Sequence, residues 1–198
     1  MNPKIPGLSI LLLAGGKSSR MGREKATLEY QGKTQLERMA GLVTPLGHPV
    51  YLSARKDQCL PGFGIQPIFD TEGLEGKGPI AGMLSAFGRN PDMAFLVIAC
   101  DLPFLERKTL EFLLENRSPR HIATAYRSAH GGLPEPLCAI WEPCSSNILK
   151  DRMAEDIRCP RKILIQENTH LIDLPNPTAL DNINTPEEYE AALASLKT

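Results

Sequence analysis

The chain has 198 residues, 42% of them hydrophobic and 23% charged, which is typical of a folded globular protein and excludes a disordered or fibrous one. Its 22 basic and 23 acidic residues leave a net charge of -1, so the composition gives no electrostatic footprint for nucleic acid or for an anionic membrane. Five cysteines without a C-x-x-C pair predict reduced thiols, and no apolar run approaches the ~18 residues of a membrane span, so we expect a cytoplasmic protein.

Short apolar runs alternate along the chain with segments of helical period, a pattern that predicts βαβ units and a largely parallel sheet. The predicted strands are residues 8–13, 50–54, 66–69, 94–99, 122–126 and 137–141. The predicted helices are residues 34–43, 80–87, 108–116, 145–153, 161–166 and 187–196. Thr185, Pro186 and Glu188 supply an N-cap, a first-turn proline and a capping-box glutamate for the last helix. No repeat or linker divides the chain, so we expect one domain over residues 1–198.

The first predicted strand runs into Gly15 and Gly16, and four cationic side chains follow between positions 17 and 25. Glycine tolerates positive φ and has no Cβ, so backbone N–H groups at such a corner can approach an anion closely. The cations would then neutralise a polyphosphate. Neither of the two commonest phosphate-loop spacings is present, and a strand-end turn with a solvated basic loop explains the same residues.

The buried strand 94–99 is followed by a single acidic residue, Asp101, and then by Pro103. In an open parallel sheet, ligands bind outside the carboxyl ends of the strands. Mg²⁺ prefers one or two carboxylates together with phosphate oxygens and water, so Asp101 is a candidate metal ligand. The alternative is that Asp101 caps a turn. Cys100 beside it fits a small core residue better than a nucleophile.

The stretch LAGGKSSRMGREK, residues 13–25, resembles the signature L-A-G-G-x-S-x-R-M-G-x-D-K of the molybdenum cofactor guanylyltransferases, which belong to the nucleotidyltransferase superfamily. The resemblance implies an α/β fold, a three-layer αβα sandwich of Rossmann-like type with a mostly parallel central sheet. The second glycine favours the guanylyl branch, since the cytidylyl and sugar-phosphate relatives more often read L-A-A-G. Glu24 stands where the signature usually has Asp. Contacts to the guanine nucleotide are implied for Leu13, Ala14, Gly15 and Gly16, to its phosphates for Arg20, and to its triphosphate for Lys25.

Two further stretches resemble the same family. In its C-D-x-P motif the aspartate binds the metal, which implies Mg²⁺ at Asp101. The stretch IFDTEGLEGKGPIAGML, residues 68–84, implies that Asp70 lies at the nucleotide and that Gly78 and Gly82 lie where the backbone passes close to it. Ser53 falls where the family commonly has Asn, and a hydroxyl lacks the paired donor and acceptor of an amide.

Near the C-terminus, LDNINTPEEY resembles the family's N-x-N-T-P-E-E ending, which implies that Asn182 and Asn184 face the acceptor phosphate or the pterin. From the residues alone, both asparagines also fit a loop that leads into the capped helix. The stretch GGLPEPLCAIWEP aligns loosely with the segment that approaches the pterin, and Glu135 occupies a place where histidine is common.

The implied reaction is attack by the terminal phosphate of molybdenum-molybdopterin on the α-phosphorus of GTP, with loss of pyrophosphate. A phosphate monoester has a second pKa near ~6, so this acceptor is ionised at neutral pH and a general base is dispensable. Lys25, Arg20 and Asp101 would carry the catalysis with Mg²⁺ as cofactor. GTP and molybdenum-molybdopterin would be the substrates, and chaperones of molybdenum enzymes or acceptor apoenzymes the protein partners, with no nucleic acid or membrane.

Three alternatives stay open. A cytidylyltransferase acting on the same or another phosphorylated acceptor shares the chemistry and differs in the base pocket. A non-catalytic nucleotide-binding partner in cofactor insertion is a second, although the presence of both Lys25 and Asp101 argues against it. A sugar-phosphate nucleotidyltransferase is the third, and 198 residues leave little chain for sugar recognition.

Overall fold

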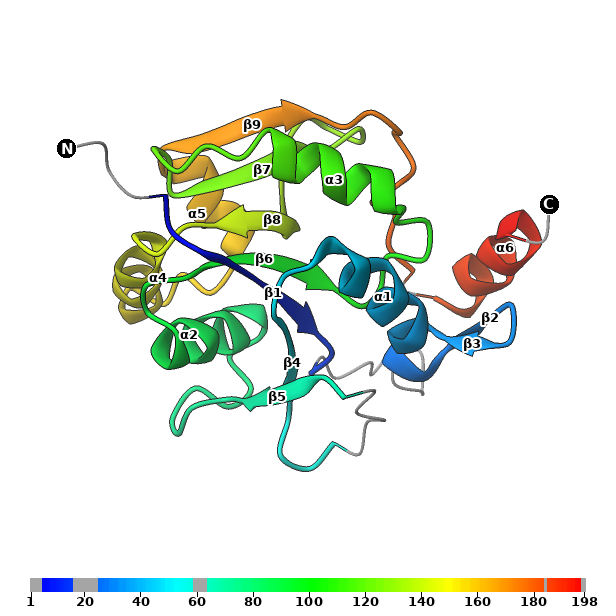
Figure 1. Cartoon of the computed structure of the whole chain (residues 1–198), viewed down its shortest axis with the longest axis horizontal. Helices are drawn as coiled ribbons and strands as arrows, with labels where there is room; N and C mark the ends of the chain where they lie inside the picture. Colours follow the sequence, from blue (N-terminus) through cyan, green and yellow to red (C-terminus); the bar gives the residue numbers. More distant parts are fainter. Residues whose placement is uncertain (1–4, 16–24, 59–63, 184, 197–198) are drawn as a thin grey trace.

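The computed structural model describes residues 5–15, 25–58, 64–183 and 185–196, and its centre is a seven-stranded sheet in the order β5-β4-β1-β6-β8-β7-β9 (Figure 1). Its strands are β1 (Leu8–Leu13), β4 (Val50–Ala54), β5 (Gln66–Phe69), β6 (Ala94–Ala99), β7 (Ala123–Arg127), β8 (Pro134–Trp141) and β9 (Thr169–Asp173). Strand β8 runs antiparallel to both of its neighbours, while β5, β4, β1 and β6 are parallel, as are β7 and β9. The predicted mostly parallel α/β sheet is therefore confirmed.

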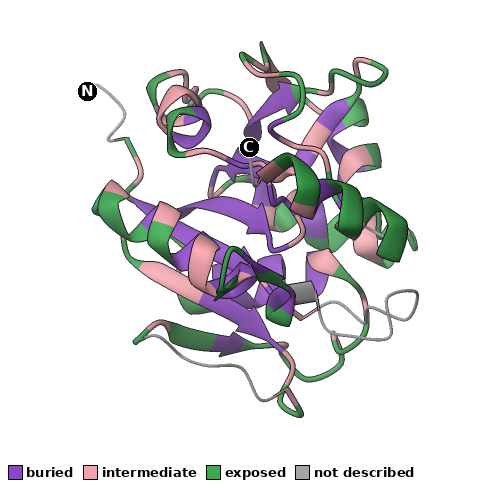
Figure 2. Cartoon of the chain, turned by 90° about the vertical axis from the view of Figure 1, so that its right-hand side faces the viewer, coloured by how far each residue is buried: buried purple, intermediate pink, exposed green. Residues whose placement is uncertain are grey.

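Helices cover both faces of this sheet, and β1 shows why. Its side chains alternate between faces. Ile10 and Leu12 pack into a cluster that includes the buried sides of α1 (Gln35–Val43) and α3 (Arg107–Glu115). Leu11 packs with residues of three other helices, α2 (Pro79–Arg89), α4 (Ser145–Ala154) and α5 (Pro160–Gln166). Burial is greatest in central strands such as β1 and β6, and Figure 2 shows buried strands, in purple, among the helices. The result is the expected three-layer sandwich.

A third, smaller cluster joins the C-terminal helix α6 (Pro186–Leu196) to the hairpin of β2 (Glu29–Tyr30) and β3 (Lys33–Thr34), which lie side by side in Figure 1. The rings of Tyr30 and Tyr189 meet edge to face, and the Tyr189 hydroxyl donates to the Glu29 carbonyl at 2.6 Å. The predicted capping box of α6 is confirmed, because Thr185 and Glu188 exchange backbone-to-side-chain hydrogen bonds at 3.2 Å in both directions.

The sequence predicted the bounds of β1, β4, β5 and β6 correctly, and its errors fall in the other half of the sheet. Strand β8 begins at Pro134, three residues earlier than predicted, and β7 begins one residue later than predicted. Strand β9 and the hairpin were not predicted. Strand β9 has the sequence THLID, with only two apolar residues and none fully buried, so it lacks the apolar run that marks β1 and β6. Helix bounds differ by one or two residues, and Thr34 is an N-cap instead of the first helical residue.

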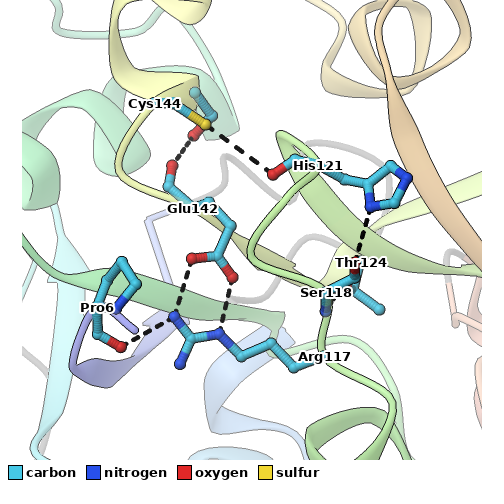
Figure 3. Close-up of polar contacts among 8 residues, drawn as sticks. Pro6, Arg117, Ser118, His121, Thr124, Glu142 and Cys144 are labelled. Carbon is cyan, nitrogen blue, oxygen red and sulfur yellow. Dashed lines mark hydrogen bonds and ion pairs between the residues drawn. The ribbon is translucent and has the colours of Figure 1, made fainter. Parts of the chain in front are cut away.

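A buried ion pair lies at the end of the sheet where β1 and β6 begin (Figure 3). Glu142 follows β8 and is 2% exposed, and Arg117 follows α3 and is 12% exposed. The guanidinium donates to both carboxylate oxygens, at 2.7 and 2.8 Å, and also to the Pro6 carbonyl at 3.0 Å. Both charges are therefore paired and hydrogen-bonded. Through its contacts with Pro6 and Glu142, Arg117 links the segment before β1 to the segment after β8.

The described helices include none that is both long enough and apolar enough to cross a bilayer.

Candidate active site

A cavity of about 360 Å³ lies at the carboxyl ends of the parallel strands, at the opposite end of the sheet from the ion pair of Arg117 and Glu142. This size falls within the ~300–1,000 Å³ typical of small-molecule sites. The residues that line it include eight of the predicted nucleotide contacts: Leu13, Ala14, Gly15, Ser53, Asp70, Gly78, Gly82 and Asp101. Motifs far apart in the sequence therefore meet in one cavity, and Gly15 and Asp101 lie on the same side of the molecule.

The corner after β1 is held by the segment that follows β4. Ala14 donates its N–H to the Ser53 carbonyl at 3.0 Å, which continues the pairing of the two strands by one residue. The Ala14 carbonyl accepts from Gln58 at 2.8 Å, and the Gly15 carbonyl accepts from Arg55 at 2.9 Å. Gly15 does not have a left-handed φ, and a Cβ on it would meet its nearest neighbours at 3.8 Å. Neither backbone conformation nor packing within the described chain requires glycine there, in contrast to the expectation from its tolerance of positive φ.

The two glycines of the α2 segment are explained by different causes. Gly78 is the N-cap of α2 and has φ +77°, a conformation that favours glycine, before Pro79 starts the helix. Gly82 is in the helix, where a Cβ would lie 2.2 Å from the Ser53 Oγ and 3.1 Å from the Leu13 Cδ2. This glycine lets α2 pack closely against the ends of β1 and β4. Ser53 is 4% exposed and lies against it.

Asp70 follows β5 and lines the same cavity. Burial raises the pKa of its carboxyl group, the charge of Glu75 raises it further, and the Arg55 guanidinium opposes both. The backbone beside it is fixed, because the Thr71 N–H donates to the buried Ser85 hydroxyl of α2 at 2.8 Å. Asp70 is therefore a partly desolvated carboxylate on a defined loop.

Asp101 follows β6 and lines this cavity and a second one. Its carbonyl accepts from the Ile183 N–H at 3.2 Å, which joins the predicted metal motif to the C-terminal asparagine motif. In the part of the chain that the structure describes, no cluster of three or more His, Cys, Asp or Glu residues could hold a metal. One carboxylate facing a cavity of nucleotide size fits Mg²⁺, which takes its other ligands from phosphate oxygens and water. Burial raises the pKa of the Cys100 thiol to about 12, as expected for a core residue.

The second cavity, of about 330 Å³, shares Ala99, Asp101 and Leu137 with the first. Asn182 and Glu135, which the motif resemblance associates with the acceptor, both line it. An ion pair and a second polar pair also line it: Glu135 accepts from Arg161 at 2.8 Å, and the His130 Nε2 lies 2.8 Å from an Asp181 carboxylate oxygen. The two cavities therefore meet at Asp101.

Comparison with known proteins decides the family. The model of the MobA-like NTP transferase domain matches residues 10–170. The chain belongs to the MobA-like NTP transferase family. It is 32% identical to a molybdenum cofactor guanylyltransferase from Pseudomonas aeruginosa over 92% of this chain and 93% of that protein. The resemblance found in the motifs is thus confirmed, and the chain is a nucleotidyltransferase.

Two other relatives add to this result. The chain is 34% identical, over 90% of its length, to a molybdenum cofactor biosynthesis bifunctional protein from Synechocystis, and it spans only 52% of that protein. A solved molybdopterin-guanine dinucleotide biosynthesis protein A from Archaeoglobus fulgidus has a TM-score of 0.80 at 23% identity, with 96% of this chain and 98% of that chain covered. This likeness shows that the fold is shared across the family.

Three predicted contacts, Gly16, Arg20 and Asn184, lie outside the described residues, as does the side chain of Lys25. The backbone of Lys25 begins a short 3₁₀ turn, Lys25–Thr27, whose Ala26 lines the first cavity.

Sequence reasoning did not find Arg55, His130, Asp181 or Arg161 as cavity residues. Arg161 and His130 pair with carboxylates 26 and 51 positions away, so no local spacing could indicate them. Arg55 directly follows β4, and its place at a strand's carboxyl end was the one available signal.

Proposed function

We propose that this protein transfers GMP from GTP to the terminal phosphate of molybdenum-molybdopterin, with release of pyrophosphate. One observation carries the proposal: eight of the predicted nucleotide contacts line one cavity, the predicted acceptor contact Asn182 lines another, and the two cavities share Asp101. A reaction between two phosphates needs both held on either side of one charge-stabilising group. The names of the relatives support guanylyl transfer as the reaction and molybdopterin as the acceptor.

The first cavity would hold GTP. Gly15 presents backbone without a Cβ to the phosphates, and Lys25 and Arg20 are the proposed partners of the triphosphate. Asp70 would accept hydrogen bonds from the nucleoside, since a carboxylate on a fixed loop offers two acceptor oxygens. The second cavity would hold the acceptor, with Asn182 as a neutral hydrogen-bonding contact.

Asp101 is the proposed metal ligand, and bound Mg²⁺ would supply positive charge to phosphate oxygens of donor and acceptor. The chain's own residues position the two phosphates and neutralise the charge that leaves with pyrophosphate. A phosphate monoester with a second pKa near ~6 needs no base to become a nucleophile at neutral pH. His130, paired with Asp181, is accordingly assigned no proton transfer.

The test is a panel of GTP, CTP, ATP and UTP with and without Mg²⁺, read by the melting temperature and by calorimetry. A nucleotide that binds only the folded state must raise its melting temperature. We expect GTP with Mg²⁺ to give the largest rise, and pyrophosphate release when molybdenum-molybdopterin is added. Preference for CTP would favour the cytidylyltransferase alternative, whereas GTP binding without pyrophosphate release would favour the non-catalytic partner. No response to any nucleotide contradicts the proposal.

The single domain, the cytoplasmic location, and delivery of the product to a chaperone or an acceptor apoenzyme stay predictions of the sequence.

A further inference from the structure

The segment after β4 makes an unusual set of contacts with the corner after β1. In a regular strand, a residue turns its N–H and C=O toward one neighbouring strand and the next residue turns toward the other. Leu13 follows this rule, because its carbonyl accepts from Cys100 on the β6 side, and Ala14 follows it with both groups on the β4 side. Gly15 breaks it: its carbonyl accepts from Arg55, also on the β4 side.

We infer that Arg55 and Gln58 are positioning residues that hold the Ala14 and Gly15 carbonyls away from the triphosphate. This inference rests on the proposed function. In a trans peptide, the carbonyl and the following N–H point in opposite directions. With the Ala14 carbonyl held by Gln58 at 2.8 Å, the Gly15 N–H points away from β4, toward the side where β6 and Asp101 lie.

Both side chains are themselves fixed. The Gln58 amide uses its two ends, because its Oε1 accepts from the Arg55 N–H at 3.3 Å while its Nε2 donates to Ala14. Arg55 also donates from Nε to Asp57 at 3.1 Å, and its side chain is 23% exposed. An arginine can do this because its planar group carries several donors in fixed directions.

Glycine makes such a brace necessary. A peptide that involves Gly15 can rotate at little cost because glycine has no Cβ, and even a Cβ built there would meet its nearest neighbours only at 3.8 Å. A rotation would turn a carbonyl dipole toward the phosphates and remove an N–H donor from them. The cation of Arg55 therefore acts through the Gly15 backbone, and the phosphate chain is the part of the nucleotide that should depend on it.

The experiment compares GTP, GDP and GMP affinities, by calorimetry with Mg²⁺, for the full chain and four variants, one of which, Arg55→Lys, keeps only the positive charge. Arg55→Met keeps the apolar stem and removes the donors, and Gln58→Met does the same for the amide. Arg107→Met is the matched control, because it removes an exposed arginine that pairs with Glu111 on α3, outside both cavities. Hydrogen bonds to charged groups are worth enough that Arg55→Met should bind GTP about tenfold or more weakly. GMP binding should change little, so the ratio of the GMP to the GTP dissociation constant should fall by a similar factor in Arg55→Met and Gln58→Met. The ratio should stay unchanged in Arg107→Met.

The readouts separate the outcomes. Equal weakening of GTP, GDP and GMP, with a lower melting temperature of the free protein, means that Arg55 only supports the fold and overturns the inference. So does full recovery by Arg55→Lys, because a plain positive charge would then suffice. If the unmodified chain does not bind GTP at all, the proposed function fails, and unchanged GTP binding in Arg55→Met defeats the positioning role alone.

Discussion

The two ends of the central sheet, where β1 and β6 begin and where they finish, use their charged residues in different ways. At the end where β1 and β6 begin, Arg117 and Glu142 are buried and satisfy each other through two hydrogen bonds. At the end where these strands finish, Asp70, Asp101 and Arg55 line a cavity. Removing one member of a buried, fully hydrogen-bonded pair is strongly destabilising, and such a pair has few donors or acceptors left for a ligand. A charged side chain that lines a cavity can act on a substrate, even where it also pairs within the chain, as Arg55 does with Asp57. The difference predicts which variants lose function and which lose stability.

The largest expected effect is at Asp101. Asp101→Asn removes one negative charge and keeps the shape, so we expect nucleotidyl transfer to fall roughly a thousandfold, because a metal ion contributes several kcal/mol to such a transition state. Asp101→Asn keeps the size of the side chain and the backbone contact with Ile183, so the melting temperature of the free protein should change little compared with the loss of activity. Pyrophosphate release and a thermal scan on one preparation measure both. Near-normal turnover in Asp101→Asn means that the metal is bound elsewhere.

At the end of the sheet where β1 and β6 begin, we expect a substitution to lower stability and to leave activity unchanged. Arg117→Met leaves the Glu142 carboxylate buried without its partner, and breaking a buried pair in this way costs about 3 kcal/mol or more. The control is Arg127→Met, which removes an exposed pair with Asp173 and should cost less than about 1 kcal/mol. Urea unfolding measures both variants, and activity per folded molecule should be unchanged in each. A loss of GTP affinity in Arg117→Met would show that the ion pair and the nucleotide cavity, at opposite ends of the sheet, are coupled.

The sequence predicts those strands and site residues that are marked by their own neighbours in the chain, and it misses contacts between distant residues. Strands β1 and β6 were predicted with their bounds because almost all of their residues are apolar, and Gly15 and Asp101 were found because each follows such a run. The edge strand β9 carries no such pattern. The pair of Arg117 and Glu142 and the brace of Arg55 on Gly15 join residues 25 and 40 positions apart, so only the folded chain brings them together.

Two glycines at the cavity edge sharpen the comparison further. Gly82→Ala places a Cβ 2.2 Å from the Ser53 Oγ, so we expect a loss of about 1 to 2 kcal/mol in stability from overpacking. Ser53→Ala in the same chain should recover part of that loss. Gly15→Ala should leave stability within about 0.5 kcal/mol, because the new Cβ meets only ordinary contacts, and should weaken GTP binding. Thermal unfolding and calorimetry distinguish a packing glycine from one that faces the ligand. Equal stability loss in both variants would remove that distinction.

The smallest expected effect is at Asp70, where stability and binding should change in opposite directions. Burial and Glu75 raise the pKa of this carboxyl in the folded state, so the folded protein holds the proton more tightly than the unfolded chain does. Stability linked to this group is then fully present below the unfolded pKa and is lost as the pH rises through the folded pKa. Asp70→Asn should remove that loss, and the variant should unfold at a slightly higher urea concentration than the unmodified chain at pH 7, with no difference in acid. The same variant should bind GTP more weakly, because an amide replaces one acceptor oxygen with a donor. A variant that is more stable and still binds GTP normally would mean that Asp70 does not contact the nucleotide.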